Sequence, residues 1–308
     1  MGYKHGTYQT ETSSDISLPI VLDYGHFIVG TAPMNKVKKE RLDVLLVERG
    51  FFETRENAKR HIMAGIILVN DVPVDKPGTK IPSDVRLRIK GHVMPYVGRG
   101  GYKLEKAIKE FHLDLKNLVM ADIGASTGGF TDCALQNGIA KVYAIDVGTN
   151  QLDWKLRTNP HVINLEKTNI KQVTEDMIGE KVDFISTDIS FISVLKILPA
   201  VHSILKPEGS VVILIKPQFE AGKEKVGKGG VIRDENIHED VIRDTLSAFE
   251  TEGFHVWEIT YSPIKGGSGN IEFLALLKKD RPERSMVNTD IIHDIVEEAH
   301  QVFKGEMS

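Results

Sequence analysis

Residues 119–137 contain the feature that most constrains the fold: an apolar strand, a turn of small residues and a helix in immediate succession. The turn, residues 124–129, holds three glycines with only alanine, serine and threonine between them. Residues without bulky side chains let a ligand lie against the backbone at the carboxyl end of a first strand. The spacing differs from the G-x-G-x-x-G of dinucleotide-binding folds, and acidic Asp122 lies at the end of the strand. A carboxylate there favours a ligand with a cationic amino-acid group over a pyrophosphate.

Strands and helices alternate on both sides of this turn. Apolar runs of strand length are residues 119–123, 141–146, 184–188, 211–216, 255–261 and 272–278. Helical patterns are residues 102–111, 129–137, 193–205, 238–252 and 289–303. This alternation predicts an α/β, Rossmann-like domain over residues 102–280, with a mostly parallel sheet and helices on both faces. Residues 281–308 are expected to supply a C-terminal helix that packs on it.

A smaller α+β domain is expected in front, over residues 35–90, followed by a linker at residues 91–101. Thr54 predicts the start of its second helix, and the dipeptide Asn70-Asp71 predicts the turn of a hairpin. Although the whole chain has a net charge of -4, residues 35–95 hold 13 Lys and Arg against 8 Asp and Glu. A basic module beside an acidic one is typical of a protein in which only one part holds a polyanion.

Other features narrow the class of protein. Residues 1–34 lack the pattern of a signal peptide and are expected to be a leader or extension without function. No run of eighteen apolar residues occurs, which argues against a membrane span. The single cysteine, Cys133, excludes an intramolecular disulfide and a cysteine-rich zinc site, in keeping with a cytoplasmic protein. No histidine spacing indicates a metal site.

A second carboxylate strengthens the prediction of a cofactor site. Asp146 ends the strand that follows the glycine turn, where a carboxylate can accept both hydroxyls of a ribose. A nicotinamide or other nucleotide site remains the alternative. The residues expected to bind the cofactor are Asp122, Gly124, Ala125, Ser126, Gly128, Gly129, Phe130, Asp146 and Val147.

Four charged residues are expected to meet at one edge of the sheet. Asp188 and Lys216 end two strands, Glu272 opens another after a glycine-rich run, and Lys103 lies at the start of a helix. The carboxyl ends of parallel strands share one rim, so these charges can converge there. The alternative is four solvated charges at strand ends.

The order Lys103, Asp188, Lys216, Glu272 resembles the catalytic tetrad of FtsJ-type ribose 2'-O-methyltransferases, whose catalytic domain has the class I methyltransferase fold. Together with the domain in front, residues 41–280 resemble the TlyA family of rRNA 2'-O-methyltransferases, many members of which are labelled hemolysin. The resemblance implies S-adenosylmethionine as cofactor, and a cytidine 2'-hydroxyl of ribosomal RNA, alone or within ribosomal subunits, as acceptor.

The resemblance also implies roles for the four residues. A ribose hydroxyl is a poor nucleophile and needs a base, and a lysine can serve only if its pKa is lowered by burial or by a second cation. Lys216 is therefore the expected base and Lys103 the neighbouring cation that orients the ribose. Asp188 and Glu272 are expected to hold the two ammonium groups. Methyl transfer to oxygen requires no metal.

Residues 41–90 resemble the ribosomal-protein-S-four-like (alpha-L) RNA-binding domain. The matching segments are residues 41–43, 54–62, 65, 69–71 and 76–78. Basic side chains on such a domain contribute sequence-independent affinity for phosphates. Those expected to face RNA are Arg41, Arg55, Lys59 and Arg60; a solvated helix surface is the alternative.

Two other functions remain open at this point. A membrane-active, hemolysin-like toxin would need a cationic amphipathic helix, whereas the helix at residues 289–303 is acidic. A ribosome-binding assembly factor without catalysis would not need the four charged residues. The lysine- and glycine-rich loop at residues 221–230, with Lys223, Lys225 and Lys228, is either an RNA-closing loop or a plain surface loop. The sequence does not indicate an oligomeric state.

Overall fold

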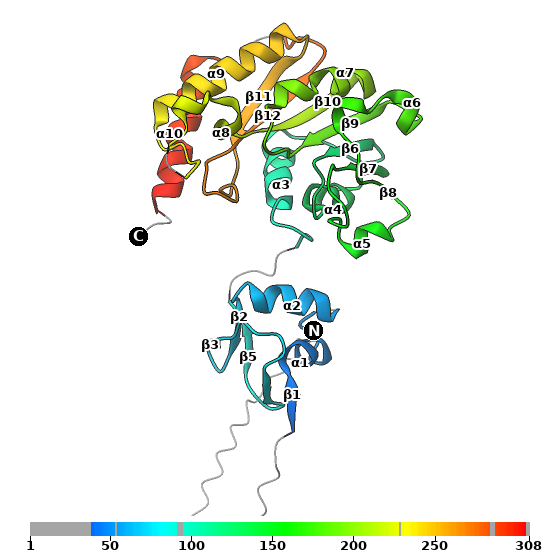
Figure 1. Cartoon of the computed structure of the whole chain (residues 1–308), viewed down its shortest axis with the longest axis vertical. Coiled ribbons are helices and arrows are strands. Elements are labelled where there is room, and N and C mark those ends of the chain that lie inside the picture. Colours follow the sequence, from blue (N-terminus) through cyan, green and yellow to red (C-terminus); the bar gives the residue numbers. More distant parts are fainter. Residues whose placement is uncertain (1–37, 53, 91–94, 228, 284–286, 306–308) are drawn as a thin grey trace, which may run out of the picture. The chain divides into compact units, whose positions relative to one another are not determined.

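The chain forms two compact units, which divide between residues 92 and 93 (Figure 1). The structure, a computed structural model, describes residues 38–52, 54–90, 95–227, 229–283 and 287–305. The expected leader at residues 1–34 lies outside the described residues, as does most of the segment immediately after residue 90.

The first unit is a small α+β domain. Its elements are β1 (Lys39–Arg41), α1 (Leu42–Glu48), α2 (Arg55–Met63), β2 (Ile67–Val69), β3 (Val72–Pro73), β4 (Lys80–Pro82) and β5 (Leu87–Ile89). The strands form an antiparallel β1–β4 pair and a sheet in the order β3-β2-β5. Leu42, Leu46, Ile62 and Ile67 are fully buried between the helices and the strands. Burial of such side chains stabilises a domain by about 1.5–3 kcal/mol each.

Local signals in the sequence set the boundaries of this unit. The Thr54 hydroxyl accepts a hydrogen bond from the Asn57 backbone N–H at 3.2 Å, which confirms Thr54 as the N-cap of α2. Asn70 and Asp71 both have positive φ, 50° and 64°, as a type I′ hairpin turn requires. The sequence did not indicate β1 and β4, because each has three residues and is defined by its pairing with the other.

The second unit contains a seven-stranded sheet in the order β11-β12-β10-β9-β6-β7-β8. Its strands are β6 (Val119–Ile123), β7 (Lys141–Ile145), β8 (Val162–Leu165), β9 (Val182–Thr187), β10 (Leu205–Ile215), β11 (His255–Tyr261) and β12 (Phe273–Lys278). Its α-helices are α3 (Gly101–Glu110), α4 (Gly129–Gln136), α5 (Trp154–Arg157), α6 (Glu175–Ile178), α7 (Leu198–Ile204), α8 (Pro217–Glu220), α9 (Glu235–Thr251) and α10 (Thr289–Gly305). The short 3₁₀ helices are η1 (Ile170–Gln172), η2 (Val194–Ile197) and η3 (Lys223–Lys225).

The central strands of this sheet are buried on both faces, which is why they are mostly apolar. In β10, Val211, Ile213 and Ile215 point into one core, and Val212 and Leu214 point into the other. The first core also takes residues of α7, α9 and α10, and the second takes residues of α3 and α4. Figure 1 shows these helices as layers on the sheet, and the predicted mostly parallel α/β fold is confirmed.

One strand runs against the others. β12 pairs antiparallel with both β10 and β11, whereas β10, β9, β6, β7 and β8 pair in parallel. Ile215 lies opposite Phe273, so the residue that ends β10 and the residue that opens β12 are neighbours at one rim. The sequence argument for a shared rim assumed parallel strands. Glu272 reaches that rim because β12 is antiparallel.

One segment differs from the expected domain limits, and the C-terminal helix packs as expected. Residues 95–101, expected to be linker, belong to the second unit: Tyr96 and Val97 are buried, and the Val97 N–H donates to Asp132 Oδ2 at 2.8 Å. The C-terminal helix α10 packs on α9 and β11 through Ile292, Val296 and Phe303.

Candidate active site

The glycine turn between β6 and α4 is packed too closely for larger residues at two positions. Gly124 has φ +82°, and a Cβ there would lie 2.5 Å from the Asp188 carbonyl oxygen. Gly128 has φ +94°, and a Cβ there would overlap the Leu156 side chain. Both residues also have a φ in the left-handed region, which favours glycine. Close packing and backbone conformation therefore each require glycine at these two positions. The turn therefore brings the ends of β6 and β9 together, while Gly128 itself packs inward.

The Asp122 side chain is buried within the fold and is not exposed at the turn. Its carboxylate is fully buried and accepts hydrogen bonds from the Thr131 N–H at 3.0 Å, the Thr131 hydroxyl at 2.7 Å and the Ser186 hydroxyl at 2.9 Å. Burial raises the pKa of this carboxyl to about 6, although these hydrogen bonds lower it. All of these partners belong to the fold, and Asp122 is not among the residues that line the two cavities at the glycine turn, so its contact with a ligand stays a prediction.

Asp146 lies at the edge of a cavity of about 340 Å³, which we call the loop cavity. Asp146 Oδ2 accepts from the Ser126 N–H at 2.8 Å and Oδ1 from the Gly148 N–H at 2.7 Å. Each oxygen keeps a second lone pair for a ligand hydroxyl. The other lining residues are Ile123, Gly124, Ser126, Ile145, Val147, Gln151, Thr168, Asn169, Ile170, Asp188, Ile189, Ser190, Phe191 and Ile192. The cavity thus joins a polar end at Asp146 to apolar walls.

The four charged residues converge beside this cavity, as Lys103, Asp188, Lys216 and Glu272, hereafter the tetrad. Lys216 Nζ lies 2.6 Å from Asp188 Oδ1. Lys103 Nζ lies 3.2 Å from Asp188 Oδ2 and 2.7 Å from Glu272 Oε2. Asp188 therefore contacts both lysines, one on each oxygen, and Glu272 contacts Lys103 from the other side.

The tetrad is largely removed from solvent. The side chains of Lys103, Lys216 and Glu272 are 7%, 8% and 3% exposed, and that of Asp188 is 21% exposed. Burial alone raises the pKa of Asp188, but the ammonium groups of Lys103 and Lys216 outweigh it and lower that pKa below its usual value. Asp188 is thus held ionised between two amines.

The tetrad lines a cavity of about 280 Å³, the tetrad cavity, which shares Gly124, Ser126, Asp188 and Ser190 with the loop cavity. Ala125, Gly129 and Phe130 of the glycine turn also line the tetrad cavity. Seven of the nine expected cofactor residues therefore line one of these two cavities, and Asp122 and Gly128 do not.

A third cavity opens on the other side of the tetrad. This aromatic cavity, of about 470 Å³, is lined by Ser190, Phe191, Lys216, Gln218, Phe219, Val226, Gly230, Gly267, Ser268 and Glu272. The Ser190 hydroxyl accepts a hydrogen bond from Lys216 Nζ at 2.8 Å. Lys216 and Glu272 therefore face both the tetrad cavity and the aromatic cavity.

Phe191 borders the loop cavity and the aromatic cavity, and the sequence reasoning missed it. Its side chain is 88% exposed, and its ring centroid lies 5.5 Å from that of Phe219. Its φ of +69° is rare for an aromatic residue and costs about 1–3 kcal/mol. An exposed aromatic residue held in a strained conformation beside charged groups is typical of a functional site. The sequence did offer one indication of Phe191, because this residue lies three positions after Asp188, just beyond the end of β9.

In the first unit, the candidate RNA-binding residues are partly engaged with neighbours. Arg41 Nε lies 2.9 Å from Asp43 Oδ1, and Arg55 NH2 lies 2.8 Å from Asp43 Oδ2. Their side chains remain 43% and 51% exposed, so each keeps donors for another anion. Lys59 pairs with Glu56 at 2.6 Å, and Arg60 is half-buried.

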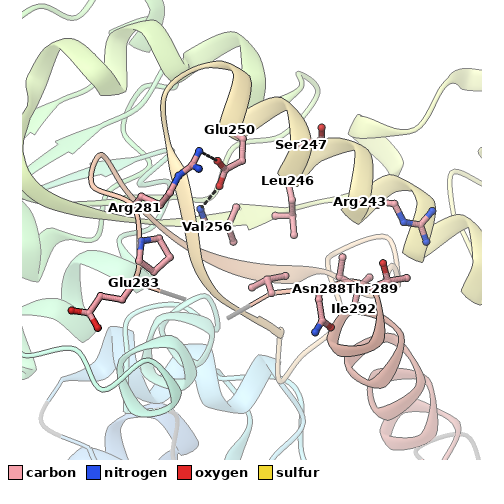
Figure 2. Close-up of a pocket in the computed structure, with 12 residues that line it drawn as sticks. Arg243, Leu246, Ser247, Glu250, Val256, Arg281, Glu283, Asn288, Thr289 and Ile292 are labelled. Carbon is pink, nitrogen blue, oxygen red and sulfur yellow. Dashed lines mark hydrogen bonds and ion pairs between the residues drawn. The ribbon is translucent and has the colours of Figure 1, made fainter. Parts of the chain in front are cut away.

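A further hollow of about 550 Å³ lies in the second unit, away from this site. It lies between α9, β11 and the start of α10, where Arg281 pairs with Glu250 at 3.6 Å (Figure 2). It contains no tetrad residue, and residues 284–286 beside it are outside the described part of the chain. Within the described residues, no group of three His, Cys, Asp or Glu is placed to hold a metal ion. Nor does any described helix have the length and apolarity needed to cross a membrane.

Comparisons with known protein families agree with this two-unit organisation. Residues 96–279 match the FtsJ-like methyltransferase family, and residues 40–87 match the S4 domain. The chain is 51% identical over 270 residues to the "Putative rRNA methyltransferase YqxC" of Bacillus subtilis, covering 87% of the chain and 96% of that relative.

The matches to two further proteins extend over nearly the whole length of those proteins. The chain is 36% identical over 264 residues to the 16S/23S rRNA (cytidine-2'-O)-methyltransferase TlyA of Mycobacterium tuberculosis, covering 85% of the chain and 98% of that relative. A solved structure named "Putative hemolysin from Streptococcus thermophilus" is 47% identical with a TM-score of 0.70, and the match covers 88% of the chain and 99% of that structure.

Proposed function

The chain belongs to the FtsJ-like methyltransferase family, and on that premise we propose that it methylates a ribose 2'-hydroxyl of ribosomal RNA, on cytidine, with S-adenosylmethionine as methyl donor. The observation that carries this proposal is the tetrad. Four charged side chains from four separate segments meet in one ion-paired group next to the glycine turn.

The two cavities at the glycine turn fit the methyl donor. Asp146 suits the two ribose hydroxyls, and the apolar walls of the loop cavity at Ile145, Ile170 and Ile189 suit an adenine ring. The small residues of the turn leave room for the amino-acid end along the backbone of the tetrad cavity. S-Adenosylmethionine supplies a methyl group that is activated by its bond to a sulfonium.

The tetrad supplies the base that the acceptor hydroxyl needs. Lys216 Nζ is the base that accepts the hydroxyl proton while the oxygen bonds to the methyl carbon and the bond from that carbon to sulfur breaks, which leaves a neutral thioether. Asp188 holds Lys216 at 2.6 Å and stabilises the ammonium that forms. Lys103, fixed between Asp188 and Glu272, is the positioned cation that donates to the ribose oxygens. General-base catalysis of this kind contributes about a hundredfold to ten-thousandfold in rate.

RNA as the acceptor is supported by both units. The first unit matches the S4 domain, and Arg41 and Arg55 present partly exposed guanidinium groups there. In the second unit, the exposed ring of Phe191 beside Lys216 is suited to stack on a nucleobase. Cytidine as the target rests on the similarity to the Mycobacterium tuberculosis relative, which is named a cytidine-2'-O-methyltransferase.

The two alternatives gain no support from the described residues. A toxin that inserts through α10 would need a free apolar helix face, but Ile292, Val296, Ala299 and Phe303 are buried in the core. An assembly factor without catalysis would leave the ion-paired tetrad without a role.

Incubation of the protein with small and large ribosomal subunits and labelled S-adenosylmethionine tests the proposal. We expect label in ribosomal RNA, at one or a few ribose 2'-oxygens of cytidines in either or both subunits. Calorimetric titration with S-adenosylmethionine is the parallel measurement. Binding without transfer to any RNA would contradict the proposed acceptor, and the absence of binding would contradict the proposed donor.

A further inference from the structure

We propose that a fourth cavity, separate from the tetrad, binds a backbone phosphate of the RNA strand that carries the acceptor nucleotide. This inference rests on the proposed function, because it assigns to the same RNA a second point of contact on the catalytic unit. The cavity, about 440 Å³, is hereafter called the basic cavity. It is lined by Val231, Ile232, Arg233, Lys265, Ser268, Gly269, Ile271, His300, Phe303 and Lys304.

The charge of the basic cavity selects an anion. Arg233, Lys265 and Lys304 line it, and none of its described lining residues is acidic. Lys304 is neutralised in part by Glu235 at 3.0 Å. Arg233 and Lys265 make no ion pair with any carboxylate in the described residues. Two uncompensated cations therefore face one concave surface, which attracts a polyanion in a salt-dependent way.

Lys265 is held in place by its surroundings. Its Nζ lies 5.0 Å from the centroid of the Phe303 ring, and donates to the Phe303 carbonyl oxygen at 3.5 Å. A lysine whose stem and head group are already ordered loses less conformational entropy when it binds an anion. This arrangement distinguishes Lys265 from a lysine that moves freely in solvent.

The basic cavity adjoins the aromatic cavity, which contains Lys216 and Glu272. Both are lined by Ser268, and each takes other lining residues from the chain near Gly230 and near Ser268. A strand whose ribose reaches Lys216 can therefore pass Ser268 toward Arg233 and Lys265. A phosphodiester is the anion that such a strand offers at regular intervals.

Asn270 fixes the walls of the basic cavity. It is fully buried; its Oδ1 accepts from the Ile232 N–H at 2.9 Å, and its Nδ2 donates to the Gly230 carbonyl oxygen at 2.8 Å and the Ser268 hydroxyl at 3.0 Å. One side chain thus ties the two segments together. The basic cavity is therefore preorganised, which lowers the entropic cost of binding.

The test is a pair of charge-changed double variants, Arg233→Glu/Lys265→Glu and the milder Arg233→Gln/Lys265→Gln. We expect the Gln variant to raise the KM for RNA about tenfold or more near 0.1 M salt, because each lost phosphate contact weakens binding by roughly tenfold there. The plot of log K against log salt for ribosomal RNA becomes shallower by about 1, as expected for the loss of one phosphate contact. The kcat at saturating RNA and the affinity for S-adenosylmethionine stay within about twofold of wild type, since neither cation contacts the tetrad.

The matched control for the Gln variant is Lys109→Gln/Lys116→Gln, which also removes two positive charges. Both lysines are exposed, and they lie at the end of α3 and before the amino end of β6, away from the rim that holds the tetrad. If the control and the Gln variant had the same KM for RNA and the same salt slope, the proposed phosphate site would be wrong. Failure of the proposed function has a different signature: wild-type protein that transfers no methyl group to RNA. In that case the salt slope of RNA binding still decides the phosphate site.

Discussion

Each unit of the protein holds a carboxylate between two cations, and the two clusters differ in a way that separates binding from chemistry. In the first unit, Arg41 donates to both oxygens of Asp43, at 2.9 Å to Oδ1 and 3.1 Å to Oδ2, and Arg55 donates to Oδ2 at 2.8 Å. In the second unit, each oxygen of Asp188 contacts one lysine: Oδ1 lies 2.6 Å from Lys216 Nζ, and Oδ2 lies 3.2 Å from Lys103 Nζ.

The cations of the two clusters have different chemistry and different access to solvent. The Arg41 and Arg55 side chains are 43% and 51% exposed, whereas those of Lys216 and Lys103 are 8% and 7% exposed. A guanidinium stays charged in proteins and presents several donors, while a buried lysine can lose its proton. The first cluster is therefore suited to hold positive charge toward an anion, and the second to accept a proton from a bound hydroxyl.

The largest effect is expected at Lys216, because the second cluster is proposed to act through an amine that accepts a proton. Lys216→Met lowers kcat by about a hundredfold to ten-thousandfold because the base is lost. Lys216→Arg lowers it to a similar extent, because a guanidinium keeps its charge and accepts no proton. Single-turnover methyl transfer to ribosomal RNA measures both, with exposed Lys196→Met as the control. An active Lys216→Arg enzyme would remove the distinction between the clusters.

The next effect is the stability of the second unit without Lys103. In Lys103→Met, the carboxylate of Glu272, 3% exposed, loses its ion-pair partner. Leaving a buried charge uncompensated costs about 3–5 kcal/mol in the free energy of unfolding. Urea unfolding followed by the fluorescence of Trp154 and Trp257, both in this unit, measures it. Adding Glu272→Gln should restore most of the loss; a single variant as stable as wild type would contradict the buried pairing.

The acid sensitivity of the first unit follows from Asp43. Burial raises the pKa of this carboxyl, but the hydrogen bonds and charges of Arg41 and Arg55 lower it to about 2 from its usual 3.8. Because the folded pKa is depressed, the stabilisation is complete above pH 3.8 and is lost as the pH falls through 2. The difference corresponds to about 2 kcal/mol.

Amide hydrogen exchange of α1 and α2 between pH 5 and 2 measures this loss. Asp43→Asn removes the titrating group, so the variant starts less stable and loses less on acidification. The same pH dependence in both proteins would show that Asp43 is not the responsible group.

The smallest effect is expected at Arg55. Arg55→Lys keeps the charge and changes the affinity for RNA by less than about threefold. Arg55→Gln weakens binding by up to about tenfold and makes the salt dependence shallower by about 1, as expected for one lost phosphate contact. Filter binding to ribosomal RNA over a range of salt concentrations distinguishes the two. If Arg55→Gln kept the wild-type salt dependence of RNA binding, Arg55 would pair with Asp43 and would not contact an RNA phosphate.

The sequence was sufficient for the parts of the fold that local patterns encode. The strand, small-residue turn and helix at residues 119–137 and the cap at Thr54 depend on residues close in the chain, and both are present. The pairs β1–β4 and β10–β12 depend on partners far away in the chain, which a propensity pattern does not contain. The antiparallel direction of β12, on which the position of Glu272 depends, is of this second kind.

The features of the candidate site also fall into two groups: those that the local sequence indicates and those that depend on distant partners. Residue types at strand ends indicated the tetrad, but not that Asp188 would contact both lysines. Asp122 was expected to face the ligand, whereas the Thr131 and Ser186 hydroxyls turn it inward. Phe191 was missed because its importance lies in its exposure and its positive φ, and these become visible only in three dimensions.

Nucleoside mass spectrometry of ribosomal RNA tests the central claim, that the tetrad activates a ribose 2'-hydroxyl, most directly. RNA is treated with S-adenosylmethionine and either wild-type protein or Lys216→Met, then digested to nucleosides. The account predicts 2'-O-methylcytidine with the wild-type protein and almost none with the variant. A methyl group on a base, or equal 2'-O-methylation by the two proteins, would contradict it.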